Sequence, residues 1–205
     1  MHSILVPQGH PYRAQAQAYI RATYLQAHAA HIVEFPDTLV AGVSSSQDII
    51  CSAGIRTEHS GFFSEIYLDK PIECLIAQAM SRPVARSEVL EIVSLASTTV
   101  QPCLKLLDEI TALGRQHGYK WCLFTGTNKL RRLLRHTGLE SIKLGPAKIE
   151  NVSEPEQWGN YYACDPWVCL LKNIPSAPLE FTRAKGRSRR TRARQLAIQS
   201  QANNA

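Results

Sequence analysis

The sequence has no apolar run long enough to cross a membrane. Its 205 residues are 44% hydrophobic and 20% charged, and Glu91 interrupts the apolar segment 89–100. A spanning helix needs about 20 consecutive apolar residues. The first residues also lack the basic and apolar regions of a secretory signal peptide. We therefore expect a cytoplasmic protein without a transmembrane segment.

Several motifs with well-defined chemistry are missing as well. The chain contains no Gly-x-Ser-x-Gly, Gly-x-Gly-x-x-Gly or P-loop sequence, and it has no internal repeat. Its six cysteines include no Cys-x-x-Cys pair, and the histidines show no metal-ligand spacing beyond a loose pair of His28 and His31. We expect no metal site, and cysteines that are reduced and buried.

The positive charge is concentrated near the end of the chain. The net charge is +6, but residues 183–205 hold seven of the 23 Lys and Arg and none of the 17 Asp and Glu, so residues 1–182 have a net charge of −1. Residues 175–205 have almost no apolar periodicity, which predicts a flexible tail after a folded domain over 1–174. The basic run 183–194 could bind nucleic acid, anionic lipid or an acidic protein, or simply be solvated.

Helical and strand patterns fill the rest of the sequence. Apolar residues three and four apart predict helices, and short β-branched runs predict strands. The expected helices are 12–30, 71–80, 102–117 and 128–137, and the expected strands are 38–43, 47–56, 89–96, 120–125 and 141–144. Strands alternate with helices after residue 89, which favours an α/β sandwich with parallel pairing in its second half.

Glu91 is the first candidate for a functional residue. It interrupts an otherwise apolar strand, where burial would raise the pKa of the carboxyl toward that of a useful general base. Alternation along a strand does not tell which face the side chain occupies. Glu91 could therefore also point to a solvated face of the sheet, or pair with an arginine such as Arg56.

The starts of two predicted helices are further candidates. Ser97, Thr98 and Thr99 precede one helix, and 125–128 leads into the next. Free N–H groups at such positions, with hydroxyls nearby, bind phosphates or polar carbonyls. The alternative is ordinary capping by Thr99 and by Thr127 or Asn128, which needs no ligand.

An aromatic cluster follows in 158–167. Trp158, Tyr161, Tyr162 and Trp167 could form one wall of an apolar pocket, with phenol hydroxyls to orient a ligand. They could equally close the core.

Four sequence blocks resemble a known bacterial family, thermostable hemolysin. They are 65–73 (EIYLDKPIE), 91–96 (EIVSLA), 121–127 (WCLFTGT) and 158–162 (WGNYY). They come in the family's order and span roughly residues 10–172. The resemblance implies a GNAT-like acyltransferase fold, with a mixed central sheet and helices on both faces, akin to acyl-homoserine-lactone synthases and N-acyl amino acid synthases.

The resemblance also implies a function and a set of site residues. The expected reaction moves an acyl group, as a rule a fatty one, from acyl-CoA or acyl carrier protein to an amine or amino acid, with no metal. Glu91 would deprotonate the amine, and Ser94 and Tyr161 would complete the catalytic group. The donor's pantetheine arm would enter between strands 89–96 and 120–125. The residues expected at the donor are Leu95, Ala96, Ser97, Thr99, Thr125 and Asn128, and those expected at the acceptor are Arg56, Trp121, Trp158 and Tyr162.

Two other functions stay open. The family name suggests a membrane-acting haemolysin, which would need an export route and an exposed amphipathic segment. Residues 97–102 contain no glycine, whereas the usual phosphate loop of GNAT proteins is rich in glycine. This departure leaves a carrier protein open as the donor, and it also leaves open a non-catalytic binding protein with the GNAT fold.

Overall fold

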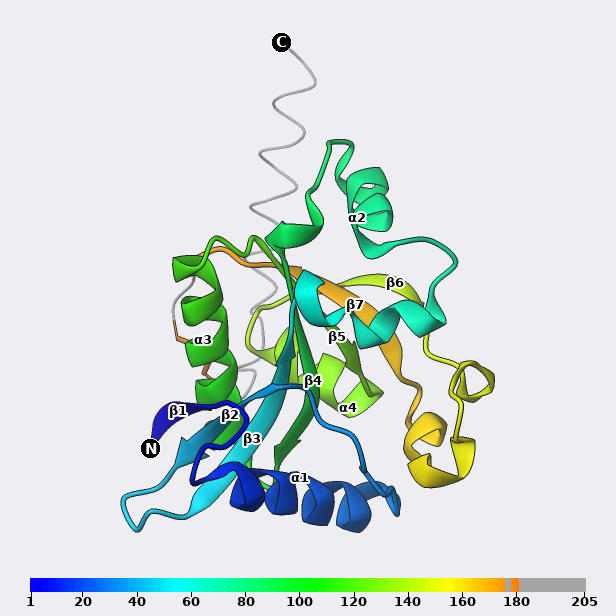
Figure 1. Cartoon of the computed structure of the whole chain (residues 1–205). Helices are drawn as coiled ribbons and strands as arrows, with labels where there is room; N and C mark the ends of the chain where they lie inside the picture. The colour runs from blue at the N-terminus through cyan, green and yellow to red at the C-terminus, as the bar shows by residue number, and fades with distance from the viewer. Residues whose placement is uncertain (176–177, 181–205) are drawn as a thin grey trace, which may run out of the picture.

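A single mixed sheet of seven strands organises the chain (Figure 1). The computed structural model describes residues 1–175 and 178–180. The strands are β1 (His2–Val6), β2 (Thr38–Val43), β3 (Ile49–Arg56), β4 (Val89–Ser97), β5 (Trp121–Gly126), β6 (Ile142–Pro146) and β7 (Trp167–Lys172). The helices are α1 (Arg13–His28), α2 (Ile72–Met80), α3 (Val100–Gln116) and α4 (Asn128–His136).

The strand order is β1-β2-β3-β4-β5-β7-β6, and β4 with β5 form its one parallel pair within the described chain. The predicted parallel pairing in the second half holds for β4 with β5 but not for β6. This strand pairs with β7, antiparallel, and β7 in turn pairs antiparallel with β5. Neither β7 nor β1 was predicted from the sequence. Because β7 inserts between β5 and β6, the last helix–strand unit does not close as a parallel crossover.

The helices cover both faces of this sheet and form separate cores with it. Against one face, α3 and α4 pack through residues such as Leu104, Ile110 and Leu134. Against the other face lie α1, through Ile20, and α2, through Ile76. The predicted α/β sandwich with a mixed central sheet is confirmed.

The basic run 183–194 lies outside the described residues. Of the predicted tail, the structure describes residues 175 and 178–180, and Leu179 among them is buried in the core that α3 and α4 share. In the described ranges, none of the helices is long and apolar enough to span a membrane. All six cysteines are free, and four of them are buried.

A short 3₁₀ helix, η2 (Phe63–Tyr67), is fastened to the domain by Arg86. The guanidinium donates to both carboxylate oxygens of Glu65, at 2.5 and 2.6 Å, and to Glu73 at 2.8 Å. It also lies 4.6 Å from the ring centroid of Phe62. Arg86 therefore fixes the segment on both sides of Ser64.

Replacing Arg86 with Leu should lower the free energy of unfolding by about 2–3 kcal/mol, because two partly buried carboxylates lose their partner. Replacing it with Lys should cost less, since the charge stays and only the two-pronged geometry is lost. Both values can be measured by urea unfolding.

The cost of Arg86→Leu should depend on pH in a defined direction. The hydrogen bonds from Arg86 lower the pKa of Glu65. This stabilisation is therefore complete above the unfolded pKa of about 4.3 and is lost as the pH falls through the lower folded pKa. A difference between wild type and variant that stays constant down to pH 2 would contradict this account of the anchor.

Candidate active site

The strands β4 and β5 pair along only part of their length. Their register runs from Val89 opposite Trp121 to Ile92 opposite Phe124 and stops there. Ser94, two residues later, has a positive φ of 51°. Beside it, the β3–β4 register shifts between Ser52 and Gly54. The two strands thus part beyond the Ile92–Phe124 pair and leave an opening through the sheet.

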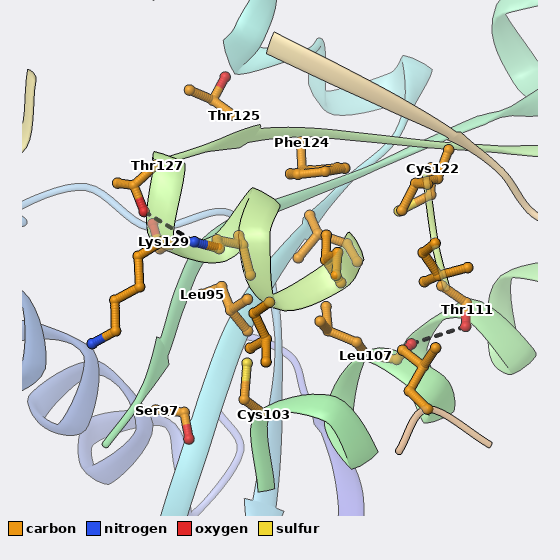
Figure 2. A pocket seen from close by; sticks show the side chains of 18 of the residues that line it. Leu95, Ser97, Cys103, Leu107, Thr111, Cys122, Phe124, Thr125, Thr127 and Lys129 are labelled. Carbon is orange, nitrogen blue, oxygen red and sulfur yellow. Dashed lines mark hydrogen bonds between the residues drawn. The ribbon is translucent and has the colours of Figure 1, made fainter. Parts of the chain in front are cut away.

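A first cavity, of about 260 Å³, is lined by β4, β5, α3 and α4 and, through Tyr24 and His28, by the end of α1. Figure 2 shows Ser97, Thr127 and Lys129 at one end of it and Cys122 and Thr111 at the other end. Apolar side chains line the space between the two ends; they include Leu95, Cys103, Leu107 and Phe124. The cavity therefore combines a polar end with an apolar interior.

A second cavity, of about 310 Å³, lies on the opposite side of the opening. Its lining includes Arg56 from β3, Ser64 from η2 and Trp158 from the 3₁₀ helix Pro155–Trp158. Glu34 and Glu154 also line it. Side chains of both charge signs therefore line this cavity.

The two cavities meet at the opening between β4 and β5. The residues that line both cavities are Tyr24, Ile92, Ser94, Thr125 and Tyr161. Two molecules that occupy the two cavities would therefore come closest to one another at these residues, which include Ser94 and Thr125. This is the arrangement that a transfer between two bound substrates requires.

Glu91 lies next to this junction but does not open onto it. Its side chain is fully buried, so the solvated-face alternative is wrong. The carboxylate accepts hydrogen bonds from the backbone N–H groups of Phe63, at 2.7 Å, and Ser64, at 2.8 Å. It also accepts one from the Ser64 hydroxyl, at 2.6 Å. Of the described residues that line the two cavities, none is Glu91.

A chain of hydroxyls connects Glu91 to the junction. Ser64 Oγ lies 2.8 Å from Thr125 Oγ1. Because the single proton of the Ser64 hydroxyl is donated to Glu91, Ser64 can only accept from Thr125. The Thr125 hydroxyl therefore donates to Ser64 and keeps its own lone pairs for a donor in the cavity.

Burial raises the pKa of Glu91 above its usual range, while the hydrogen bonds from Ser64 and Phe63 and the charge of Arg56 oppose that rise. Arg56 stands opposite Glu91 in the β3–β4 register, but its guanidinium donates to the backbone oxygen of Ser60. The buried carboxylate thus accepts three hydrogen bonds and has an increased affinity for a proton.

Two members of the aromatic cluster line the cavities: Tyr161 lines both of them, and Trp158 lines the second. Tyr161 is buried and its hydroxyl lies 3.4 Å from the backbone oxygen of Thr125. Trp158 stacks on Phe63, with ring centroids 5.9 Å apart. Desolvation raises the pKa of Tyr161 well above that of a free phenol, so its hydroxyl stays protonated and can donate. The cluster is thus both core and cavity wall.

The two predicted helix starts differ in their capping. The Thr127 side chain accepts from the backbone N–H of Leu130, so the capping alternative holds for α4. At α3, the Thr99 side chain makes no capping hydrogen bond, and the Ser97 hydroxyl donates to the Thr99 carbonyl. Ser97 and Thr99 both line the first cavity. The first N–H groups of α3 thus adjoin the polar end of that cavity.

The structure separates the remaining predicted site residues from the junction. Trp121 is buried in the core with α2, and Tyr162 hydrogen-bonds Tyr67. Ala96 packs in the core with α1. These three residues and Asn128 are not among the described residues that line the two cavities. Leu95, by contrast, lines the first cavity.

Ser64, Tyr24 and Lys129 are among the site residues that were not predicted from the sequence. Ser64 lies in a 3₁₀ turn, which has no periodic pattern, although the family block 65–73 begins one residue later. Tyr24 and Lys129 belong to predicted helices, but their place at the junction or at the polar end depends on tertiary packing.

Solved structures with a similar fold include acyl-homoserine-lactone synthases, an N-acyl amino acid synthase and a putative N-acetyltransferase. The acyl-homoserine-lactone synthase MesI, described as CoA-dependent, is 15% identical with a TM-score of 0.56, covering 91% of this chain and 96% of its own. FeeM, an N-acyl amino acid synthase from uncultured soil microbes, is 13% identical with a TM-score of 0.54, covering 84% and 92%. A putative N-acetyltransferase from Lactobacillus plantarum is 12% identical with a TM-score of 0.52, covering 85% and 100%.

These likenesses define the class of the fold, which is GNAT-like, as the sequence predicted. The family model described as "Thermostable hemolysin" matches residues 6–175, so the chain belongs to that family. The predicted family is thereby confirmed. No curated protein sequence matches the chain.

The positive φ of Ser94 leads to a prediction about the junction. A side chain in this left-handed conformation costs about 1–2 kcal/mol, and a β-branched one costs more. Ser94→Val should lower the free energy of unfolding by about 2 kcal/mol, whereas Ser94→Gly should change it by less than about 1 kcal/mol. Equal decreases in the free energy of unfolding for both variants, measured by urea unfolding, would contradict the left-handed conformation of Ser94.

Proposed function

We propose that this protein is an N-acyltransferase that moves an acyl group from the thioester of CoA or acyl carrier protein to a small amine or amino acid. The observation that carries the proposal is the junction of two cavities from opposite faces of the sheet, beside Ser94 and Thr125. The fold that this chain shares with acyltransferases supports the proposal but does not identify a substrate.

The donor is placed in the first cavity. The phosphate-bearing end of its pantetheine arm would lie at Ser97, Thr99 and Lys129, where the N–H groups at the start of α3 and an ammonium favour an anion. The arm would then follow Leu95 to the junction. Backbone groups that β4 no longer shares with β5 beyond Ile92 are available there for the pantetheine amides.

The acceptor is placed in the second cavity, with its amine at Thr125. The amine nitrogen attacks the thioester carbon, a C–N bond forms, and the C–S bond breaks. The amine proton passes to Thr125 Oγ1, the Thr125 proton to Ser64 Oγ, and the Ser64 proton to Glu91. Glu91 thus acts through two hydroxyls, in line with the hydrogen-bond directions that its three donors impose.

Two further hydroxyls serve the carbonyl and the leaving group. Ser94 lines both cavities and would donate to the oxyanion that forms at the attacked carbonyl. Tyr161 keeps its proton because burial raises its pKa, so it would donate a hydrogen bond to the departing thiolate. Protonated Glu91 returns its proton through Ser64 and Thr125 to the thiolate sulfur, which leaves as the thiol.

The place of the reaction follows from the donor. Acyl-CoA and acyl carrier protein are cytoplasmic pools, so the proposed compartment is the cytoplasm. The basic run 183–194, outside the described residues, is proposed as a contact for an acidic carrier protein, because opposite charges steer association.

Binding of donors tests the first half of this proposal. The melting temperature of the purified protein should rise with acyl-CoA, since a ligand at a hundredfold excess over its Kd adds about 2.7 kcal/mol of stability. Leu95→Trp should abolish the rise by filling the first cavity. If neither CoA, nor acyl-CoA, nor acylated carrier protein raises the melting temperature, the protein is a GNAT fold without a donor site.

Transfer itself tests the proton path. Ser64→Ala and Glu91→Gln should each lower the turnover of acyl transfer, measured by mass spectrometry of the acylated amine, by about 100-fold or more. Donor binding should stay unchanged. The matched control is Ser52→Ala, since Ser52 is a buried serine of β3 that donates to Val40 and is not among the described lining residues.

The pH profile separates this path from a structural role. Glu91 accepts a proton only when it is ionised, and its pKa is raised. The rate should therefore fall as the pH drops through a value above the usual 4.3 or so of a glutamate. Glu91→Gln should remove this acidic limb from its residual rate. An unchanged limb in the variant would show that another group titrates.

A further inference from the structure

The first cavity continues beyond the junction into an apolar arm. The proposed pantetheine, which ends at the junction, does not occupy this arm. From the polar end at Ser97 and Lys129 the cavity passes between α3 and α4 and ends near Cys122 and Thr111 (Figure 2). Leu107 and Leu134 line this arm from α3 and α4. These apolar side chains favour a hydrocarbon chain. The lining of the cavity also includes Asp108, Arg115 and Lys172.

The last described part of the chain contributes to the lining of this arm. Leu179 lines the cavity, is only 9% exposed, and belongs to the same core cluster as Leu107, Cys122 and Leu134. Its backbone N–H donates to the Asp108 carboxylate at 2.6 Å. Asp108 lies one helical turn before Thr111, which Figure 2 places at the end opposite Ser97.

A second anchor on α3 holds the chain just before this point. The Arg115 guanidinium donates to Asn173 Oδ1 at 2.9 Å. The Asn173 amide in turn donates to the carbonyls of Thr111, at 3.1 Å, and Tyr119, at 3.0 Å. The chain is therefore tied to α3 at Asn173 and again at Leu179. The charge-assisted hydrogen bond from its backbone N–H to Asp108 fixes the position of Leu179 in the cavity lining.

We infer that Leu179 is the residue that sets the length of the acyl chain this protein accepts. The inference rests on the proposed function, because it takes the acyl chain as the occupant of the apolar arm. With the thioester at the junction, the chain would extend along Phe124 and Leu107 until its terminal methyl meets Leu179. Each methylene buried before that point strengthens binding about fourfold, and the first one that no longer fits weakens it.

The test uses S-acyl-pantetheines with saturated chains of increasing even length, the fragment that CoA and carrier-protein donors share. Their Kd values are measured by calorimetry below the micellar concentration. Leu179→Ala removes three carbons from the wall and should move the optimal chain length up by about two carbons. Leu179→Phe should move the optimum down, and it keeps the test open if the smaller variant is unstable.

The control is Leu104→Ala, the same substitution in the same core cluster, at a residue outside the described lining of the cavity. It should lower the melting temperature and leave the optimal length unchanged. The inference is overturned if folded Leu179 variants keep the wild-type optimum, or if wild-type affinity shows no dependence on chain length.

Acyl transfer, measured separately with the full chain, decides on the proposed function. If the optimum shifts with Leu179 but no amine is acylated, the acyl-length role stands and the transferase proposal fails. If amines are acylated with an optimum that the Leu179 variants leave in place, the transferase proposal stands and the role of Leu179 fails.

Discussion

The parting of β4 from β5 after the Ile92–Phe124 pair is the constraint on which the rest of the site depends. A continuous ladder would seal the sheet and keep the cavities on its two faces apart. Instead, Ser94 adopts a left-handed conformation, and β4 resumes its pairing with β3 at Ala96, opposite Ser52. The pairing of β4 with β3 thus offsets the backbone strain at Ser94. The edge of β4 that no longer pairs with β5 faces both cavities.

The same opening would allow a fully buried carboxylate to take part in the proposed transfer. An isolated ion in this position would be too costly, but Glu91 receives three hydrogen bonds, two of them from backbone N–H groups of η2. That helix is held in turn by Arg86. The hydrogen bonds from Ser64 to Glu91 and from Thr125 to Ser64 connect the carboxylate to the junction. The carboxylate itself stays buried. The proton affinity of Glu91 and the geometry of the site therefore depend on one another.

Much of the fold could be predicted from the sequence, because its helices and central strands have strong local patterns. The helix with Leu106 and Ile110 on one face, and the apolar strand around Glu91, are where periodicity places them. The β7 strand was missed because its apolar run follows an aromatic cluster in the sequence, and the pairing of β6 depends on β7. Ser64 and Leu179 were missed because a 3₁₀ turn and a chain end have no periodicity, and their partners lie far away in sequence. The burial of Trp121 on the α2 side follows from strand parity, which needs the observed register.

The most direct measurement is a crystal structure of the protein with an S-acyl-pantetheine analogue in which a methylene replaces the thioester sulfur. We expect the ketone carbon to lie at the opening between β4 and β5, within reach of Ser94 and Thr125. The pantetheine should run toward Ser97 and the acyl chain toward Leu179. A ligand that occupies the second cavity, or that leaves the opening empty, would contradict the account.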